Sequence, residues 1–255
     1  MKKLLSGLLV CLMVAGCSTP STNGGETETK VLKVATSSGY DPYEVVDPSG
    51  KLIGFDIELT EAIAKKLNYT VEWQDMDFGA VITSVDTGLV DMAVAGLSPD
   101  EERAKVVDFS ISYYDAEDDT TNYILTLKDG DIKEVADIKG KKVGVQIGTI
   151  QEGTVNEIAA EHELTIDPRA KYADMVQEIK IKGLDFMVCE KAVADEFIAV
   201  NPELTAFPLG IGTESAGNAM AFKKGSDLKA AFDKEIQAML DSGELKTLQD
   251  KWFNK

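Results

Sequence analysis

Hydrophobic and polar positions follow two different periods along the chain, one typical of strands and one typical of helices. Apolar residues recur on one helical face between Phe55 and Leu67, and again between Phe78 and Leu89. Runs rich in β-branched and apolar residues alternate with such helices and predict strands at 31–37, 70–76, 91–96, 122–128, 141–148, 184–190 and 217–224. This alternation indicates an α/β fold with mainly parallel sheets flanked by helices.

The alternation is interrupted at two places. The segments DAEDDTTNYILTLKDGD, from residue 115, and GIGTESAGNAMAFKKG, from residue 210, each contain a strand-like run with no helix after it. Two crossings between lobes would produce this pattern, although loop excursions from a single sheet would look similar. We expect one lobe at 31–118 plus 217–255 and a second at 119–216, joined by a two-segment hinge.

The N-terminus has the composition of an export signal. Met1-Lys2-Lys3 precedes a mainly apolar run that is too short to span a bilayer comfortably. The run ends in VAGC, which resembles the lipobox of bacterial lipoproteins. We expect residues 1–16 to be a signal peptide, Cys17 to carry a lipid such as palmitate, and 17–30 to be a flexible tether. The alternative is an ordinary cleaved signal with an incidental cysteine. A lipid anchor favours the surface of a Gram-positive cell membrane over a Gram-negative periplasm, where the same motif also occurs.

Charge and composition exclude several classes of function. Asp and Glu outnumber Lys and Arg by 44 to 26, which gives a net charge of −18 and makes nucleic acid a poor partner. With His162 as the only histidine, neither a zinc cluster nor a Ser-His-Asp triad can be argued. The acidic run at 115–119 lacks the spacing of a calcium loop, and Cys189 is expected to pack as a small hydrophobe. We expect no catalytic residue, no metal and no cofactor.

The segment AVAGLSPDEERAKVVDFS, residues 93–110, contains Arg103, one of only two arginines in the chain. Ser98 and Glu101 have the spacing of a capping box, with Pro99 at the first helical position, so a helix is expected to begin at Ser98. Arg103 would then lie near the carboxyl end of strand 91–96, the edge at which open α/β sheets bind ligands. A guanidinium grips a carboxylate through two parallel hydrogen bonds, so Arg103 indicates a carboxylate ligand. The alternatives are a salt bridge within the chain, to Asp100, Asp108 or another nearby acid, and plain exposure at the surface.

The chain is similar to a known family in several segments. GFDIELT, AVAGLSPDEERAKVVDFS and GVQIGT occur in the order and spacing of the extracytoplasmic solute-binding proteins of polar amino acid ABC importers, and the resemblance extends over about residues 31–253. It implies a two-lobed periplasmic-binding-protein-like fold of type II. It also implies a monomeric binding protein that closes on one free amino acid and delivers it to a membrane permease. A dehydratase-like enzyme on the same fold is the alternative.

The resemblance also implies a binding site. Arg103 falls on the family's carboxylate-binding arginine, assisted by the backbone N–H groups of Ser98 and Ile150. The ligand's ammonium group would meet the Gly96 carbonyl, the Ser98 hydroxyl and Glu190. Aromatic walls fall on Tyr40 and Phe78, with Tyr43 behind. The expected ligand-binding residues are Ser37, Tyr40, Phe78, Ala95, Gly96, Ser98, Arg103, Gln146, Thr149, Ile150 and Glu190.

Three of these positions depart from the common family pattern. Ser37 stands where many relatives have aspartate, so a carboxylate that commonly recognises amide or cationic side chains is absent there. Glu190 replaces the commoner aspartate, and Ile150 replaces glycine or threonine. Together with Gly39, Ser37 favours a neutral polar amino acid over arginine or lysine.

Overall fold

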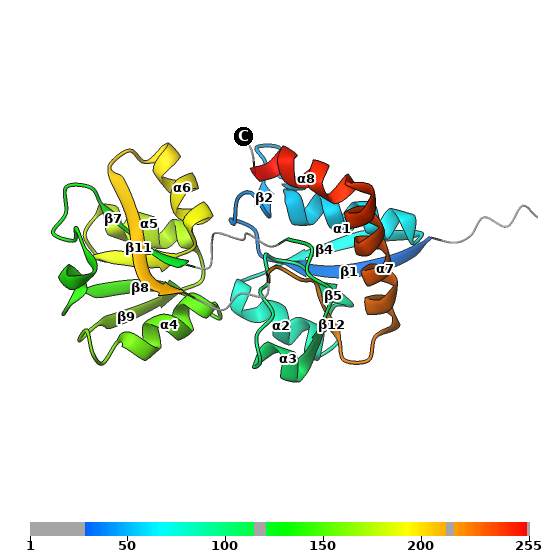
Figure 1. Ribbon diagram of the computed structural model, residues 1–255, viewed down its shortest axis with the longest axis horizontal. Coiled ribbons are helices and arrows are strands. Elements are labelled where there is room, and N and C mark those ends of the chain that lie inside the picture. The colour runs from blue at the N-terminus through cyan, green and yellow to red at the C-terminus, as the bar shows by residue number, and fades with distance from the viewer. Residues whose placement is uncertain (1–28, 115–120, 213–216, 254–255) are drawn as a thin grey trace, which may run out of the picture.

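The structure is a computed structural model that describes residues 29–114, 121–212 and 217–253. The predicted signal peptide, Cys17 and all but the last two residues of the predicted tether lie outside the described residues, as do the acidic run at 115–119 and most of the predicted hinge. The described chain forms two lobes that lie side by side along the long axis of the molecule (Figure 1). Each lobe contains one five-stranded sheet with helices on both faces, so the predicted two-lobed α/β fold is confirmed.

The first lobe is built on a sheet of order β4-β1-β5-β12-β6. Its strands are β1 (Lys30–Thr36), β4 (Tyr69–Asp75), β5 (Met92–Ala93), β6 (Val107–Phe109) and β12 (Ala221–Lys223), and a small ribbon pairs β2 (Val45–Val46) with β3 (Leu52–Ile53). The helices are α1 (Phe55–Lys66), α2 (Phe78–Asp86), α3 (Arg103–Val106), α7 (Asp227–Ser242) and α8 (Glu244–Phe253).

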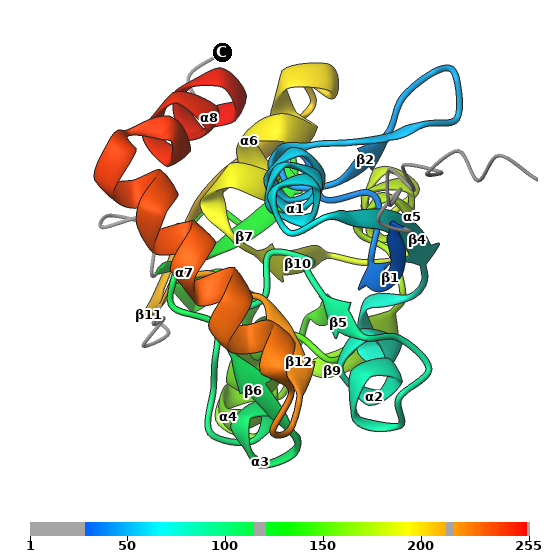
Figure 2. The same ribbon diagram turned by 90° about the vertical axis from the view of Figure 1, so that its right-hand side faces the viewer.

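Neighbouring residues of β1 enter two different cores, because successive side chains of a strand point to opposite faces. Val34 packs with α1, α7 and α8, whereas Ala35 packs with α2 on the other face. Figure 2 shows α1, α7 and α8 on one side of the sheet and α2 on the other. The helix predicted from Phe55 therefore buries its apolar face as expected, with Phe55, Leu59 and Ile63 fully inaccessible to solvent.

The second lobe has a sheet of order β11-β7-β10-β8-β9. Its strands are β7 (Thr121–Leu127), β8 (Lys142–Gln146), β9 (Thr165–Arg169), β10 (Phe186–Cys189) and β11 (Leu204–Gly212). Helices α5 (Tyr172–Lys180) and α6 (Lys191–Val200) cover one face, and α4 (Ile150–Ile158) and a 3-10 turn (Val135–Ile138) cover the other. Cys189 is buried in the core beneath α5 and α6, as a small hydrophobe would be.

Both sheets are mixed rather than mainly parallel. In each, two strand pairs are parallel and two are antiparallel. The antiparallel pairs involve β7, β11 and β12, which stand next to the passages of the chain between lobes. Thr121 pairs with Gly212 at one end of these passages, and Tyr114 pairs with Asn218 at the other. At both ends of the passages, the outgoing and returning chains therefore lie next to each other and run in opposite directions.

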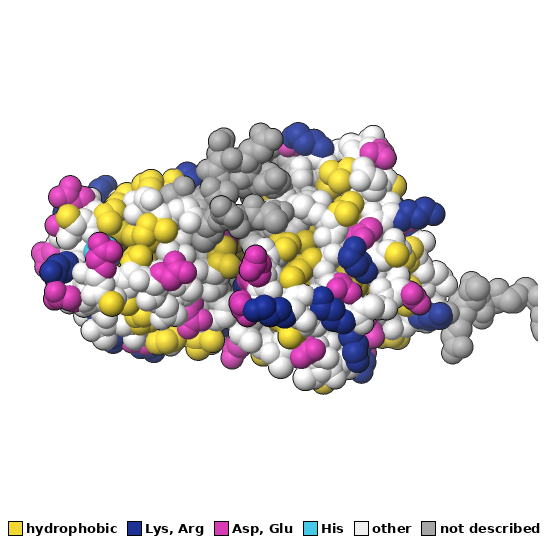
Figure 3. All heavy atoms as spheres, turned by 60° about the horizontal axis from the view of Figure 1, so that its bottom comes forward, with side chains coloured by type: hydrophobic (Ala, Val, Ile, Leu, Met, Phe, Trp, Pro, Cys, Tyr) yellow, Lys and Arg dark blue, Asp and Glu magenta, His cyan; other side chains and the backbone are white. Residues whose placement is uncertain are grey.

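No helix in the described part of the chain combines the length and the apolar composition that a membrane crossing requires. On the face seen in Figure 3, acidic and basic side chains are interspersed over both lobes.

Candidate functional site

A cavity of about 180 Å³ lies between the two lobes. It is lined at the carboxyl ends of the three parallel strands of each lobe: β1, β4 and β5 in the first, and β8, β9 and β10 in the second. That edge of an α/β sheet is where ligands bind, since the loops and helix N-termini that follow the strands converge there. Every ligand-binding residue expected from the sequence lines this cavity: Ser37, Tyr40, Phe78, Ala95, Gly96, Ser98, Arg103, Gln146, Thr149, Ile150 and Glu190.

The cavity also has lining residues that were not among the expected ligand-binding residues. Ser38 and Gly39 follow β1, Gln151 lies in α4, and residues 171–174 begin α5. The last group was missed because β9, the strand before it, was not predicted. Had β9 been recognised, the rule that ligands bind at the carboxyl edge would have placed Lys171 at the site.

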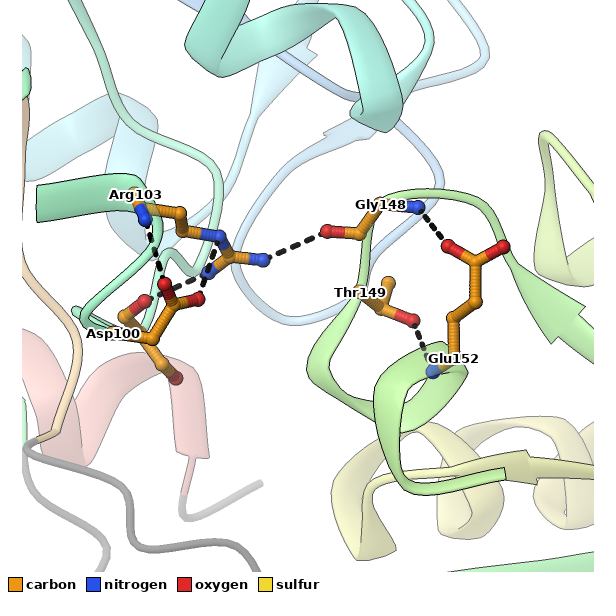
Figure 4. Close-up of polar contacts among 6 residues, drawn as sticks. Asp100, Arg103, Gly148, Thr149 and Glu152 are labelled. Carbon is orange, nitrogen blue, oxygen red and sulfur yellow. Dashed lines mark hydrogen bonds and ion pairs between the residues drawn. The ribbon is translucent and has the colours of Figure 1, made fainter. Parts of the chain in front are cut away.

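Arg103 lies on the wall of the first lobe and reaches the second. Its Nη1 donates to the Ser98 carbonyl at 2.7 Å, and its Nη2 donates across the cavity to the Gly148 carbonyl at 2.9 Å (Figure 4). Its Nε lies 3.2 Å from Asp100 Oδ2, so the salt bridge considered as an alternative is present as well. A guanidinium has five N–H donors, and these three contacts leave two for a ligand carboxylate.

The surroundings of Arg103 are apolar enough to perturb its ionisation without removing its charge. Its side chain is 11% exposed, and its guanidinium carbon lies 5.5 Å from the centre of the Phe78 ring. Burial lowers the pKa of the Arg103 guanidinium, while Asp100 and Glu190 oppose that change. Arginine stays protonated in proteins, so Arg103 presents a partly desolvated cation to the cavity.

The helix predicted to begin at Ser98 begins only at Arg103, so that prediction was wrong. The carboxylate of Asp100 accepts the backbone N–H of Arg103 at 2.7 Å, and the same side chain forms the ion pair with Nε. Asp100 therefore holds both the backbone and the side chain of Arg103, at the turn that precedes the helix. Ser98 instead supplies its carbonyl to Arg103.

The N-terminus of α4 faces Arg103 from the second lobe. Thr149 caps the helix by accepting the N–H of Glu152 at 3.1 Å, and Glu152 accepts the N–H of Gly148 at 2.7 Å (Figure 4). Gly148 has φ +82°, and a Cβ there would come within 2.9 Å of the Gly79 Cα in the first lobe. Glycine is therefore required where the two lobes touch, beside a helix N-terminus that favours anions.

Glu190 lies on the opposite wall and is bonded from both lobes. The Tyr40 hydroxyl donates to its Oε2, and Gln151 Nε2 donates to its Oε1 at 3.4 Å. Tyr40 stacks on Tyr43 and on Tyr172, with ring centres 4.8 and 6.3 Å away. Burial, and then the charge of Glu190, raise the pKa of Tyr40, so Tyr40 remains a neutral donor to the carboxylate.

Gly96 forms part of the floor of the cavity. It has φ +56°, and a Cβ there would lie 2.4 Å from Cε1 of Tyr40, so only glycine fits. Its carbonyl, expected to meet the ligand's ammonium group, already accepts Asn218 Nδ2 at 2.6 Å, which leaves one further lone pair. The hydroxyl of Ser37 is buried at the cavity and has no hydrogen-bond partner among the described residues.

Lys171 brings a second cation to the cavity. Its Nζ donates to the Ser38 carbonyl at 3.2 Å and lies 4.0 Å from Asp77 Oδ1, so it also connects the lobes. With Arg103, Lys171, Asp174 and Glu190, the lining contains as many cationic as anionic side chains. Within the described residues, no group of three His, Cys, Asp or Glu side chains could hold a metal ion.

Comparison with known proteins gives a consistent result. Residues 32–255 match the family of bacterial extracellular solute-binding proteins, family 3. The chain is 40% identical to the arginine-binding extracellular protein ArtP of Bacillus subtilis, over 95% of this chain and 96% of that protein. It is 33% identical to a probable histidine-binding protein of Campylobacter jejuni, over 99% of both. A solved structure of an ancestral arginine-binding protein bound to arginine superposes with a TM-score of 0.80 and 33% identity, covering 88% of this chain and 98% of that one.

Proposed function

Because the chain belongs to family 3 of the bacterial extracellular solute-binding proteins, we propose that it captures one free α-amino acid between its lobes and delivers it to an ABC importer. One observation carries this proposal. Arg103 and Glu190, a cation and an anion, line the same cavity from different lobes. An α-amino acid has the complementary pair of charges on one carbon, and each charge must be compensated when it leaves water.

The carboxylate end would bind at Arg103. The two N–H groups that its other contacts leave unused can grip both oxygens, and the N-terminus of α4 adds further donors. The ammonium end would bind at Glu190, whose position Tyr40 and Gln151 fix before the ligand arrives. Binding to both lobes at once would hold the lobes closed, and a closed form is what a permease could recognise.

The relatives and the lining of the cavity favour different side chains on the amino acid ligand. The names of the relatives point to arginine and histidine. Ser37 and Lys171 favour a neutral polar side chain instead, because the first supplies an unused hydroxyl and the second a cation that would repel another. The proposal includes two further points. The protein is anchored through a lipid on Cys17 at the outer face of a Gram-positive cell membrane, and it is a monomer.

A thermal-shift panel tests the proposal directly. L-arginine, L-lysine, L-histidine, L-glutamine, L-asparagine and L-serine are added separately to the purified protein. A ligand at 100 times its Kd adds about 2.7 kcal/mol of stability, and each kcal/mol moves the Tm of a protein of this size by about 2–4 °C, so we expect a rise of roughly 5–11 °C for the true ligand. If none of these amino acids raises the Tm, the proposed binding function is wrong. Recovery of the bound amino acid unchanged would count against the dehydratase-like alternative.

Lys171 is expected to bias the site against cationic side chains. In Lys171→Gln the amide can still donate to the Ser38 carbonyl, but the charge is lost. We expect the affinity for L-arginine relative to L-glutamine to rise about three- to tenfold, a modest change because Lys171 is partly solvated. Calorimetric titration measures the ratio. Lys180→Gln, at the far end of α5, is the matched control. An unchanged ratio in Lys171→Gln would exclude the bias.

A further inference from the structure

Two carboxyl groups are buried together beneath the floor of the cavity. Glu44, in the loop after β1, and Asp56, in the first turn of α1, are both 0% exposed. Asp56 Oδ2 accepts the N–H of Gly96 at 2.7 Å and the hydroxyl of Tyr113 at 2.9 Å. Asp56 Oδ1 and both oxygens of Glu44 have no hydrogen-bond donor among the described residues. Unpaired carboxylate oxygens in such a place are costly.

A proton shared by the two carboxyls accounts for the missing donor. Two carboxylates can bond to each other only if one is protonated, and two neighbouring like charges in a buried site favour that state. Burial raises the pKa of Asp56 to about 7 and raises the pKa of Glu44 well above its ordinary value. The two donors to Asp56 favour its ionised form, so Glu44 is the member that keeps the proton.

The other titratable groups around the pair do not remove this need. Tyr43 and Tyr113 are buried neutral hydroxyls, and Asp75, at the end of β4, adds negative charge that raises the pKa of Glu44 further. Lys171, at the N-cap of α5 in the second lobe, lowers the pKa of Glu44, but its effect is smaller than those of burial, Asp56 and Asp75.

The pair is connected to the cavity through one peptide unit. In a trans peptide the N–H and the C=O point in opposite directions, so the bond from Gly96 N–H to Asp56 turns the Ala95 carbonyl away from the carboxyl pair. Ala95 and Gly96 both line the cavity. The side-chain Nδ2 of Asn218 donates to the next carbonyl, that of Gly96, and the backbone carbonyl of Asn218 accepts the N–H of Tyr113 at 2.9 Å. The floor is thereby tied to both segments at which the chain passes between lobes.

We propose that Asp56, supported by a proton-carrying Glu44, is a positioning residue that fixes the Ala95–Gly96 peptide as the floor for the amino acid's ammonium group. This role rests on the proposed binding function, and neither carboxyl touches the ligand.

The first test removes the acceptor. Asp56→Ala leaves the Gly96 N–H without its partner, and we expect its affinity for the best ligand among the six amino acids of the panel to fall at least tenfold. Asp56→Asn, whose amide oxygen can still accept, should restore most of that loss. Asp108→Ala is the matched control, since Asp108 accepts the N–H of Gly225 at 2.8 Å in the same lobe, away from the cavity.

The outcomes of this test separate the two proposals. A wild-type protein that binds none of the amino acids overturns the proposed function. A wild-type protein that binds, together with a folded Asp56→Ala variant of equal affinity, overturns the positioning role alone.

The second test concerns the shared proton and does not require Asp56→Ala to fold. Glu44→Gln keeps a donor in the shape of the acid but cannot titrate. Burial raises the pKa of Glu44 in the folded wild type, which therefore holds this proton more tightly than the unfolded chain does, so this contribution to stability falls as the pH rises above the ordinary pKa of a glutamate, about 4.3. We expect the Tm of Glu44→Gln minus that of the wild type to increase between pH 5 and pH 8. A difference that stays constant over this range would exclude the shared proton.

Discussion

Replacing Arg103 with lysine should lower the affinity for the amino acid ligand by about a hundredfold or more. Lysine keeps the charge but loses the planar fork, and an ammonium cannot at once reach the Ser98 carbonyl, the Gly148 carbonyl and both oxygens of a carboxylate. Truncating one partner of a buried, hydrogen-bonded charge pair costs roughly 2–5 kcal/mol in other complexes, and about 1.4 kcal/mol corresponds to a factor of ten.

Calorimetric titration of the wild type and of Arg103→Lys measures this loss. The matched control is Arg169→Lys, the same substitution at the only other arginine, which pairs with Asp167 outside the cavity. We expect the control to bind as the wild type does. If Arg103→Lys also binds with wild-type affinity, Arg103 has only the internal roles seen in its contacts with Asp100 and Ser98.

Glu190→Gln should produce a loss of similar size for a different reason. Glutamine has nearly the same shape and can still accept from Tyr40, but it no longer supplies the negative charge that compensates the ligand's ammonium group. The neutral side chain leaves one buried cation without a counter-ion, so we expect an affinity about a hundredfold lower. Analogues that keep the carboxylate but lack the ammonium group should lose much less affinity when Glu190 is replaced.

Comparison of Glu190→Gln with Asp195→Asn provides the control. Asp195 lies on α6, pairs with Lys191 at the surface and is more than half exposed, so its neutralisation should change the affinity little. Equal affinities of Glu190→Gln and the wild type would place the ammonium group elsewhere in the cavity.

The sequence predicted most of the fold where its patterns are strong. The helix from Phe55 and the central strands have clear periods, and the structure has them at nearly the predicted positions. Strand β9 was missed because its segment, TIDPR, contains a proline and few apolar residues. Such a segment is tolerated only at the edge of a sheet, where β9 lies. The antiparallel pairing was missed because strand direction depends on the connection between lobes and not on local sequence.

At the site, residue types were easier to predict than their partners. Arg103 and Glu190 could be identified from the resemblance to a family, but the bond from Asn218 to the Gly96 carbonyl joins residues 122 positions apart. Glu44 and Asp56 were not among the expected site residues. Only the fold buries them together with three of their four carboxyl oxygens lacking a donor among the described residues, which is why a sequence pattern could not indicate their shared proton.

The pairing of Thr121 with Gly212 has a consequence for protein engineering. Both ends of the second lobe lie side by side, so this lobe is one continuous insertion whose removal opens only a short gap. Residues 121–212 could therefore be exchanged as a unit with the corresponding stretch of a relative, through two adjacent junctions. Chimeras of this kind would join the Arg103 wall of one protein to the Glu190 wall of another. Their ligand preference would show which lobe determines the choice of amino acid.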